Sequence, residues 1–204
     1  MASFTSCTLR IEAPLYNAIV FKAVVPLSDS LALLFNILYI IDFLEIPAKT
    51  GKLDDKMLGI IAKYKVPYVM MHMRGTPQTM STLTAYDDVV KEVLFYFSER
   101  IAAARNLGIN DVIVDPGFGF AKTLEQNYEL LQKLEFFQQL NLPFLAGISR
   151  KSMIYKVLNN SANESLNGTT ALNTIALCKG ASILRVHDVK EAMECVALFN
   201  VMNS

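Results

Sequence analysis

From Leu53 onward, short apolar runs alternate along the chain with segments of helical periodicity. Apolar runs of about four to eight residues, bounded by glycine, proline or polar residues, are typical of buried strands. Such runs predict strands at Val66–Met71, Val112–Asp115, Phe144–Ile148 and Ala181–Val186. Strands that alternate with helices indicate β/α units on a parallel sheet, so the pattern predicts an α/β protein.

The segments between these runs have the spacing of amphipathic helices. One predicted face carries apolar residues at i, i+3, i+4, i+7 and i+11, which are Val90, Val93, Leu94, Phe97 and Ile101. Thr123 and Gln126 have the spacing of a capping box before the apolar residues Leu130, Leu131 and Leu134. Asp188 is predicted to cap a last helix with the apolar positions Val189, Ala192, Met193 and Val196.

Residues 1–50 follow a different pattern. Two apolar runs, Ala18–Val25 and Leu31–Ile41, fit either two strands or a strand and a short helix. We therefore separate an atypical N-terminal segment, 1–50, from the regular part, 51–204. A β/α unit takes about 30 residues and a complete eight-unit barrel about 250. A chain of 204 residues is therefore too short for a regular complete barrel.

Composition and charge narrow the possible functions. Nineteen basic and nineteen acidic residues give a formal net charge of +0, so we expect a small-molecule partner and no nucleic acid. The most apolar stretch, Leu31–Ile41, is about half of the roughly 20 residues that a membrane span needs. Three cysteines, Cys7, Cys178 and Cys195, show neither CxxC nor metal-ligand spacing. Without a secretory leader pattern, these features predict a cytoplasmic protein that does not enter a membrane.

In parallel β/α architectures ligands bind at the carboxyl ends of the strands, and the first two predicted strands end in unusual motifs. The first is Met71-His-Met-Arg-Gly-Thr-Pro, whose methionines either pack against a flat heterocycle or fill gaps in the core. The second is Asp115-Pro-Gly-Phe-Gly-Phe-Ala-Lys122. Its carboxylate can accept paired N–H bonds from an aminopyrimidine, while its glycines let a ring such as Phe120 approach. An Asp-Pro-Gly turn without a ligand is the alternative.

The last two predicted strands are followed by basic motifs. Gly147-Ile-Ser-Arg-Lys-Ser152 precedes a helical pattern at Met153–Leu158. There Ser149 and the following N–H groups, with Arg150 and Lys151, are expected to bind anions or ligand carbonyl groups, and a solvated basic first turn is the alternative. A Ser/Lys nucleophile pair lacks the context of acyl transfer.

In Arg185-Val-His-Asp188, Arg185 and His187 point to the same side because strand side chains alternate. The two side chains are expected to bind phosphate together. The alternative is that Arg185 pairs with an acidic neighbour. His72 and His187 lack a third ligand for zinc.

Together the four motifs, in this order and spacing, resemble dihydropteroate synthases over about residues 52–202. Asn167-Gly-Thr-Thr-Ala-Leu-Asn is also similar to a segment of that family. The resemblance implies a (β/α)8 TIM barrel, of which this chain would form an incomplete, C-terminal portion with parallel strands and covering helices. The family belongs to folate biosynthesis and joins 6-hydroxymethyl-7,8-dihydropterin diphosphate to 4-aminobenzoate. The pterin diphosphate ionises first, and the amine then attacks the exocyclic methylene.

The resemblance also implies which residues form the site. Those expected to contact the pterin are Met71, Asp115, Gly147 and Lys151. Those expected to contact 4-aminobenzoate are Phe120, Ser149 and Lys151. The leaving diphosphate would be bound by Arg185 and His187. The expected catalytic residues are Lys151 and Arg185.

The sequence also departs from the family. The Asn-Val-Thr-Pro-Asp-Ser-Phe and Ser-Thr-Arg-Pro loops of its N-terminal part do not occur here. Magnesium is expected for the family, but its usual Asn ligand lies in the first of these loops, so no residue of this chain is assigned to a metal. A homodimer formed through the late helices is expected. Two alternatives are a non-catalytic pterin-binding remnant and a methyltetrahydrofolate methyltransferase, and the basic motifs argue against the second.

Overall fold

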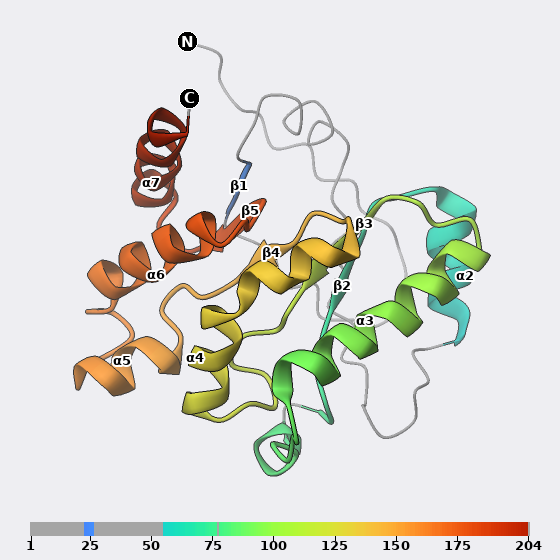
Figure 1. The fold of residues 1–204 in the computed structure, drawn as a ribbon, viewed down its shortest axis with the longest axis horizontal. Coiled ribbons are helices and arrows are strands. Elements are labelled where there is room, and N and C mark those ends of the chain that lie inside the picture. The colour runs from blue at the N-terminus through green and yellow to red at the C-terminus, as the bar shows by residue number, and fades with distance from the viewer. Residues whose placement is uncertain (1–22, 27–54, 77, 204) are drawn as a thin grey trace.

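The computed structural model describes residues 23–26, 55–76 and 78–203 (Figure 1). The strands are β1 (Ala23–Pro26), β2 (Tyr68–Met71), β3 (Val112–Asp115), β4 (Leu145–Ala146) and β5 (Ile183–Val186). The α-helices are α2 (Asp55–Tyr64), α3 (Val89–Asn106), α4 (Leu124–Gln132), α5 (Ser152–Leu158), α6 (Leu166–Cys178) and α7 (Val189–Met202). Two 3-10 helices are η1 (Met80–Thr82) and η2 (Leu134–Leu140). From β2 onward strands and helices alternate, which confirms the predicted α/β class.

Strands β2 to β5 all run in the same direction. β2 pairs with β3, with Met71 opposite Asp115, and β4 pairs with β5. A bridge between Val114 and Phe144 links the two pairs, and the Val114 N–H donates to the Pro143 carbonyl oxygen at 3.0 Å. Because parallel strands place their carboxyl ends at one edge, the loops that follow all four strands emerge together.

The first strand, which lies in the atypical N-terminal segment, runs against the other four. β1 pairs antiparallel with β5, so that Ala23 lies opposite Val186 and Pro26 lies opposite Ile183. A short apolar run indicates a strand but not its direction, so the sequence pattern could not reveal this reversal. The run Leu31–Ile41 and the first part of Ala18–Val25 lie outside the described residues.

The four predicted strands are present, and β2, β4 and β5 are shorter than expected. β2 begins at Tyr68 rather than at Val66. β5 begins at Ile183 because the Ala181 N–H donates to the Ala176 carbonyl oxygen at 2.9 Å, which ties Ala181 to the end of α6. β4 is reduced to Leu145–Ala146, the two residues that pair with β5. The chain then turns into the loop that carries Gly147.

The core lies between the strands and the helices α3 and α4, which Figure 1 shows side by side in front of the sheet. On α3 the predicted apolar face is confirmed, because Leu94 is partly buried and the other four side chains are buried. The capping box is also confirmed. The Thr123 hydroxyl accepts from the Gln126 N–H at 3.2 Å, and Gln126 accepts from the Thr123 N–H at 2.8 Å.

Two expectations for α7 were wrong. Asp188 occupies the N-cap position, but its side chain makes no capping hydrogen bond. Met193 is 58% exposed, whereas Ala192, Cys195 and Val196 are buried. Successive residues turn by about 100° in a helix, so Met193 falls outside the stripe that these three residues form. Of the helices that the structure describes, none combines the length and apolar character needed to span a bilayer.

Candidate active site

The loops at the strand ends meet around Asp115, the last residue of β3. Its Oδ1 accepts from the Gly117 N–H at 2.8 Å, and its Oδ2 lies 3.9 Å from Nη1 of Arg185. Arg185 therefore has an acidic neighbour, as one of the two interpretations of its motif predicted. A Cβ atom at Gly147 would lie 3.0 Å from Nη2 of Arg185, so the glycine makes room for the guanidinium.

Lys151 reaches the same place from the loop that precedes α5. Its Nζ donates to the Phe118 carbonyl oxygen and lies 4.7 Å from the centre of the Phe120 ring. The pKa of Lys151 is lowered from 10.5 to about 7, mainly by burial and also by Arg185, while Asp115 opposes the change. The amine therefore lies against a carbonyl group and an aromatic face rather than in a solvated basic turn.

Ser149, in the loop after β4, and His187, in the loop after β5, contact each other. Ser149 Oγ lies 2.9 Å from His187 Nδ1, and the backbone N–H of His187 donates to the same oxygen at 3.2 Å. Ser149 is buried, whereas His187 is exposed. The hydroxyl group thus connects the loops after the two strands and holds the imidazole at the rim of the site.

Arg150 turns away from this site. Its guanidinium donates to both carboxylate oxygens of Asp188, at 2.9 and 2.7 Å. It also donates to the carbonyl oxygens of Ala162 and Asn163, at 3.2 and 2.9 Å. The expectation that Arg150 joins Ser149 in an anion site was therefore wrong. The pair with Asp188 also explains why that carboxylate does not cap α7.

Of the two methionines at the end of β2, one packs in the core and the other is placed to contact a ligand. Met73 is 2% exposed and belongs to the core. Met71 is partly exposed and lies directly opposite Asp115 in the β2–β3 pair. Only Met71 of these two is placed to contact a ligand at the strand ends.

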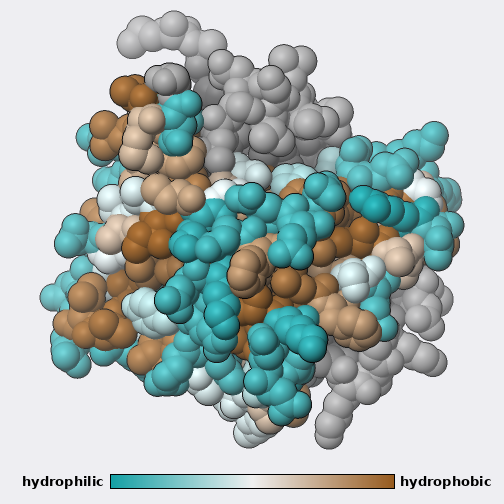
Figure 2. All heavy atoms as spheres, viewed as in Figure 1, coloured by the Kyte–Doolittle hydropathy of each residue, from teal (hydrophilic) through white to brown (hydrophobic). Residues whose placement is uncertain are grey.

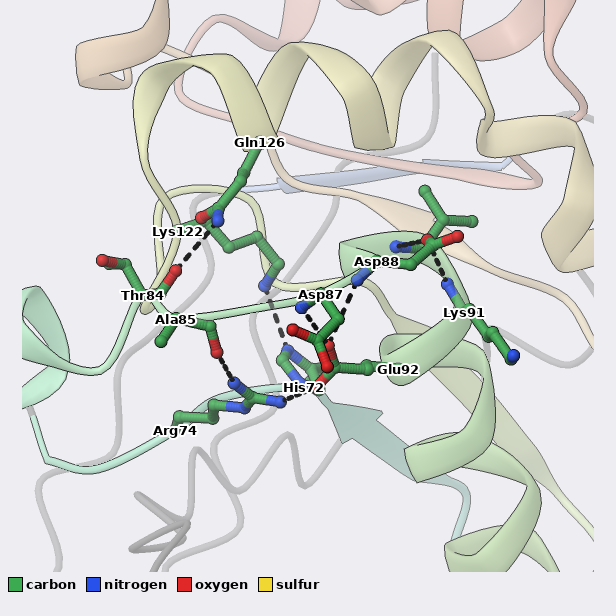
Figure 3. Close-up of polar contacts among 11 residues, drawn as sticks. His72, Arg74, Thr84, Ala85, Asp87, Asp88, Lys91, Glu92, Lys122 and Gln126 are labelled. Atoms are coloured by element: carbon green, nitrogen blue, oxygen red, sulfur yellow. Dashed lines mark hydrogen bonds and ion pairs between the residues drawn. The ribbon is translucent and has the colours of Figure 1, made fainter.

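Sequence reasoning missed a second buried base behind the loop that follows β3. Lys122 Nζ lies 3.0 Å from His72 Nδ1 and donates to the carbonyl oxygens of Gly117 and Phe120, at 3.0 and 3.1 Å. Figure 3 shows the Lys122 side chain pointing toward the His72 ring. In the sequence, Lys122 is marked only by its place at the end of the motif that follows the second predicted strand. A loop has no periodicity, so the sequence does not indicate whether its lysine faces the core or the solvent.

A second polar group fastens the loop after β2 to the start of α3 (Figure 3). Arg74 donates to the Ala85 carbonyl oxygen at 2.7 Å and to the Glu92 carboxylate at 2.5 Å. Its guanidinium also stacks 3.7 Å from the centre of the Tyr86 ring. Glu92 accepts from the Asp87 N–H at 2.8 Å as well. Arg74 therefore binds the segment just before α3 and the first turn of α3.

The charges at the strand ends do not balance. Among the described residues, three buried or partly buried cations, Lys122, Lys151 and Arg185, surround the carboxylate of Asp115. Burial lowers the pKa of each cation, and the Asp115 carboxylate opposes this each time. A bound anion would favour the charged forms in the same way. Within the described ranges no three His, Cys, Asp or Glu residues gather into a possible metal site.

Stability is expected to rise with pH because of Lys122. Burial lowers its pKa from 10.5 to about 7. Between these values the unfolded chain binds a proton that the folded chain does not, so the free energy of unfolding increases with pH. Urea unfolding at about pH 7 and about pH 9.5 should show a smaller increase in Lys122→Met than in the native chain. An equal increase in both proteins would contradict the prediction.

Comparison with known proteins places this arrangement in a family. Residues 47–187 match the family model described as pterin binding enzyme. The chain belongs to the pterin-binding enzyme family. Dihydropteroate synthase of Escherichia coli strain K12 is 48% identical over 141 residues, which cover 68% of this chain and 50% of that protein. The chain thus spans about half the length of this relative.

Solved structures of this family have the same fold. Dihydropteroate synthase of Yersinia pestis, in complex with a sulfonamide drug, matches with a TM-score of 0.70 and 38% identity over 72% of this chain and 54% of that chain. The Thermus thermophilus enzyme, in complex with 4-aminobenzoate, matches with a TM-score of 0.72 and 35% identity over 76% of this chain and 64% of that chain. The predicted resemblance to dihydropteroate synthases is therefore confirmed.

Proposed function

We propose that the chain acts in folate biosynthesis as a dihydropteroate synthase. It would condense 6-hydroxymethyl-7,8-dihydropterin diphosphate with 4-aminobenzoate and release diphosphate. The observation that carries the proposal is the meeting of Asp115, Lys151 and Arg185 at the ends of three neighbouring parallel strands. The names of the relatives support the same reaction.

The pterin would lie against Asp115. A buried carboxylate is a strong acceptor for the two N–H groups of an aminopyrimidine edge. Met71 lies opposite Asp115 and is partly exposed, and Gly147, after the next strand, allows the Arg185 guanidinium to approach. Lys151 would supply a donor to the acceptor atoms of the same ring.

The aminobenzoate would lie at the Phe120 side of the site. Its ring can stack on Phe120, and its negative carboxylate can be bound at the start of α5, where Ser149 and Lys151 lie. An approaching carboxylate would also favour the charged form of Lys151. The pairing of Lys151 Nζ with the Phe120 ring supports a common subsite for the two side chains.

The diphosphate would be bound by Arg185 and His187. In the reaction the C–O bond to the exocyclic methylene breaks, and its electron pair leaves with the diphosphate. The amine of 4-aminobenzoate then forms the new C–N bond and loses a proton to solvent. Negative charge therefore develops on the leaving group, where the guanidinium can stabilise it. Such a mechanism requires positioned reactants and cations, and it requires no protein nucleophile.

Magnesium stays a prediction. Magnesium prefers oxygen ligands in octahedral geometry. Among the described residues the site offers two amines, a guanidinium, an imidazole and the Asp115 carboxylate, which is already bonded to Gly117 and close to Arg185. These groups do not form a magnesium site, and we propose no step through the metal.

We also propose that β2 to β5 belong to an incomplete (β/α)8 barrel in the cytoplasm. The parallel strands and the solved relatives support the barrel. Cys178 and Cys195 are free thiols in the structure, which is consistent with a reducing compartment.

A homodimer through α7 is supported by apolar side chains on its surface. Figure 2 shows hydrophobic residues over α7 and α5. The exposed apolar residues of α7 are Met193, Leu198, Val201 and Met202. Leu198→Glu should convert a dimer into a monomer in sedimentation velocity, because it places a charge in an apolar contact, whereas Lys190→Ala should remain dimeric. A monomeric native chain, or a dimeric Leu198→Glu chain, would refute this interface.

Lys151→Ala should reduce turnover by about 100-fold or more, because it removes a donor from both substrate subsites. Purified protein is assayed with pterin diphosphate, magnesium and 4-aminobenzoate. The matched control is Lys156→Ala, which changes an exposed lysine of α5. Full activity of Lys151→Ala would overturn the site assignment.

Two further measurements separate the alternatives. Calorimetric binding of the pterin without turnover in the native chain would identify a non-catalytic remnant. Methyl transfer from methyltetrahydrofolate to a corrinoid would identify a methyltransferase.

A further inference from the structure

We propose that Lys122 is a positioning residue, which holds the turn at residues 117–120 in the shape that the aminobenzoate subsite requires. It does not itself touch a ligand. The proposal deepens the proposed function and rests on it for the identity of the ligand. Its structural part, the hold of Lys122 on the turn, can be tested without any ligand.

The Lys122 amine has three partners at hydrogen-bonding distance, which are the carbonyl oxygens of Gly117 and Phe120 and Nδ1 of His72. A protonated amine can donate to all three. A neutral amine can donate to the two carbonyl oxygens and accept from an Nδ1–H of the imidazole. Both protonation states therefore satisfy the same contacts, so the hold on the turn does not depend on the charge of Lys122.

The turn that Lys122 holds also contacts Lys151. Gly117 and Phe120, at the two ends of the turn, accept from Lys122. Phe118, between them, accepts from Lys151, and the Phe120 ring lies beside the same amine. The two lysines thus bind the same turn. A shift of the turn would move the Phe120 ring and the Lys151 amine together.

His72 gives Lys122 a fixed anchor. Its ring is 2% exposed and packs edge to face against Tyr96, at 4.9 Å between ring centres. Its backbone N–H donates to the Asp115 carbonyl oxygen at 2.9 Å. Lys122 therefore ties the loop after β3 to a rigid residue of the loop after β2.

A role in packing alone would predict a different outcome from a role in positioning. Lys122→Met keeps the apolar stem and removes the donors, and replacing a buried charge by a hydrophobic side chain is often neutral for stability. A packing residue would therefore tolerate the change without effect on the turn. A positioning residue would leave the fold intact and loosen residues 117–120.

Amide hydrogen exchange on the full chain tests the hold directly. Exchange at residues 117–120 should become about 10-fold faster in Lys122→Met, while α3 keeps its protection. Lys122→Gln, which retains donors but is shorter, should give an intermediate rate, and Lys156→Met should match the native chain. Unchanged exchange at 117–120 in Lys122→Met would overturn the proposal, and so would equal acceleration throughout the chain.

Ligand binding tests the consequence. With pterin diphosphate present, calorimetry should show that Lys122→Met binds 4-aminobenzoate about 10-fold more weakly, while its affinity for pterin diphosphate changes by less than about 3-fold. Equal losses for both compounds would refute a role specific to the aminobenzoate subsite. A native chain that binds neither compound would refute the proposed function, and the exchange measurement would still decide whether Lys122 holds the turn.

Discussion

Asp115→Asn is expected to lower the free energy of unfolding by about 3 kcal/mol and to weaken binding of the pterin diphosphate by about 100-fold or more. The carboxylate is buried between Arg185 and the two lysines, Lys122 and Lys151. Asparagine keeps the size of the side chain and can still accept from the Gly117 N–H. It removes the negative charge that favours the charged forms of Arg185 and the two lysines. It also removes an acceptor that could bind two N–H groups of the ligand.

Urea unfolding and calorimetry with pterin diphosphate measure the two effects separately. Asp111→Asn is the matched control, because Asp111 lies immediately before the same strand and its side chain is exposed. The control should keep both native stability and native affinity. Native stability in Asp115→Asn would show that the three cations do not depend on this carboxylate. Native affinity would remove Asp115 from the pterin subsite.

Gly117→Ala is expected to destabilise the chain by about 3 kcal/mol or more. Gly117 has a φ of +69°, in the left-handed region, and an added Cβ atom would lie 2.0 Å from the carbonyl oxygen of His72. The backbone of the loop after β2 would have to move away. That movement would also displace His72 from Lys122.

The steric part of this effect can be isolated with Gly108→Ala. Gly108 has a similar φ of +80°, but an added Cβ atom would meet no other atom within 4 Å. Gly108→Ala should therefore cost only the conformational term, about 1 kcal/mol. Equal losses of unfolding free energy in the two variants would show that the loops after β2 and β3 separate easily.

The strand ends could be predicted from the sequence because two simple rules apply there. Parallel strands bring their carboxyl ends to one edge, so motifs far apart in the chain, such as those at Asp115 and Arg185, are expected together. The structure brings these two residues within 3.9 Å. Capping-box spacing at Thr123 was equally informative, because both of its hydrogen bonds are local.

Features that depend on a choice between partners could not be predicted. Arg150 and Asp188 carry charges that suit several roles, and only the structure shows that they bind each other. Lys122 stands in a loop, where no repeating pattern reveals which side faces the core. The antiparallel direction of β1 depends on a pairing with the far end of the chain, and a short apolar run carries no information about that.

The pairing of β1 with β5 has a consequence for how the protein is made. Ala23–Pro26 leave the ribosome well before their partner strand, Ile183–Val186, has been synthesised. At about 5–20 residues per second, the interval between the two is on the order of ten seconds or more. This antiparallel pair therefore cannot form before Ile183–Val186 have been synthesised. Closing so large a loop comes late, after the local β/α units have had time to fold.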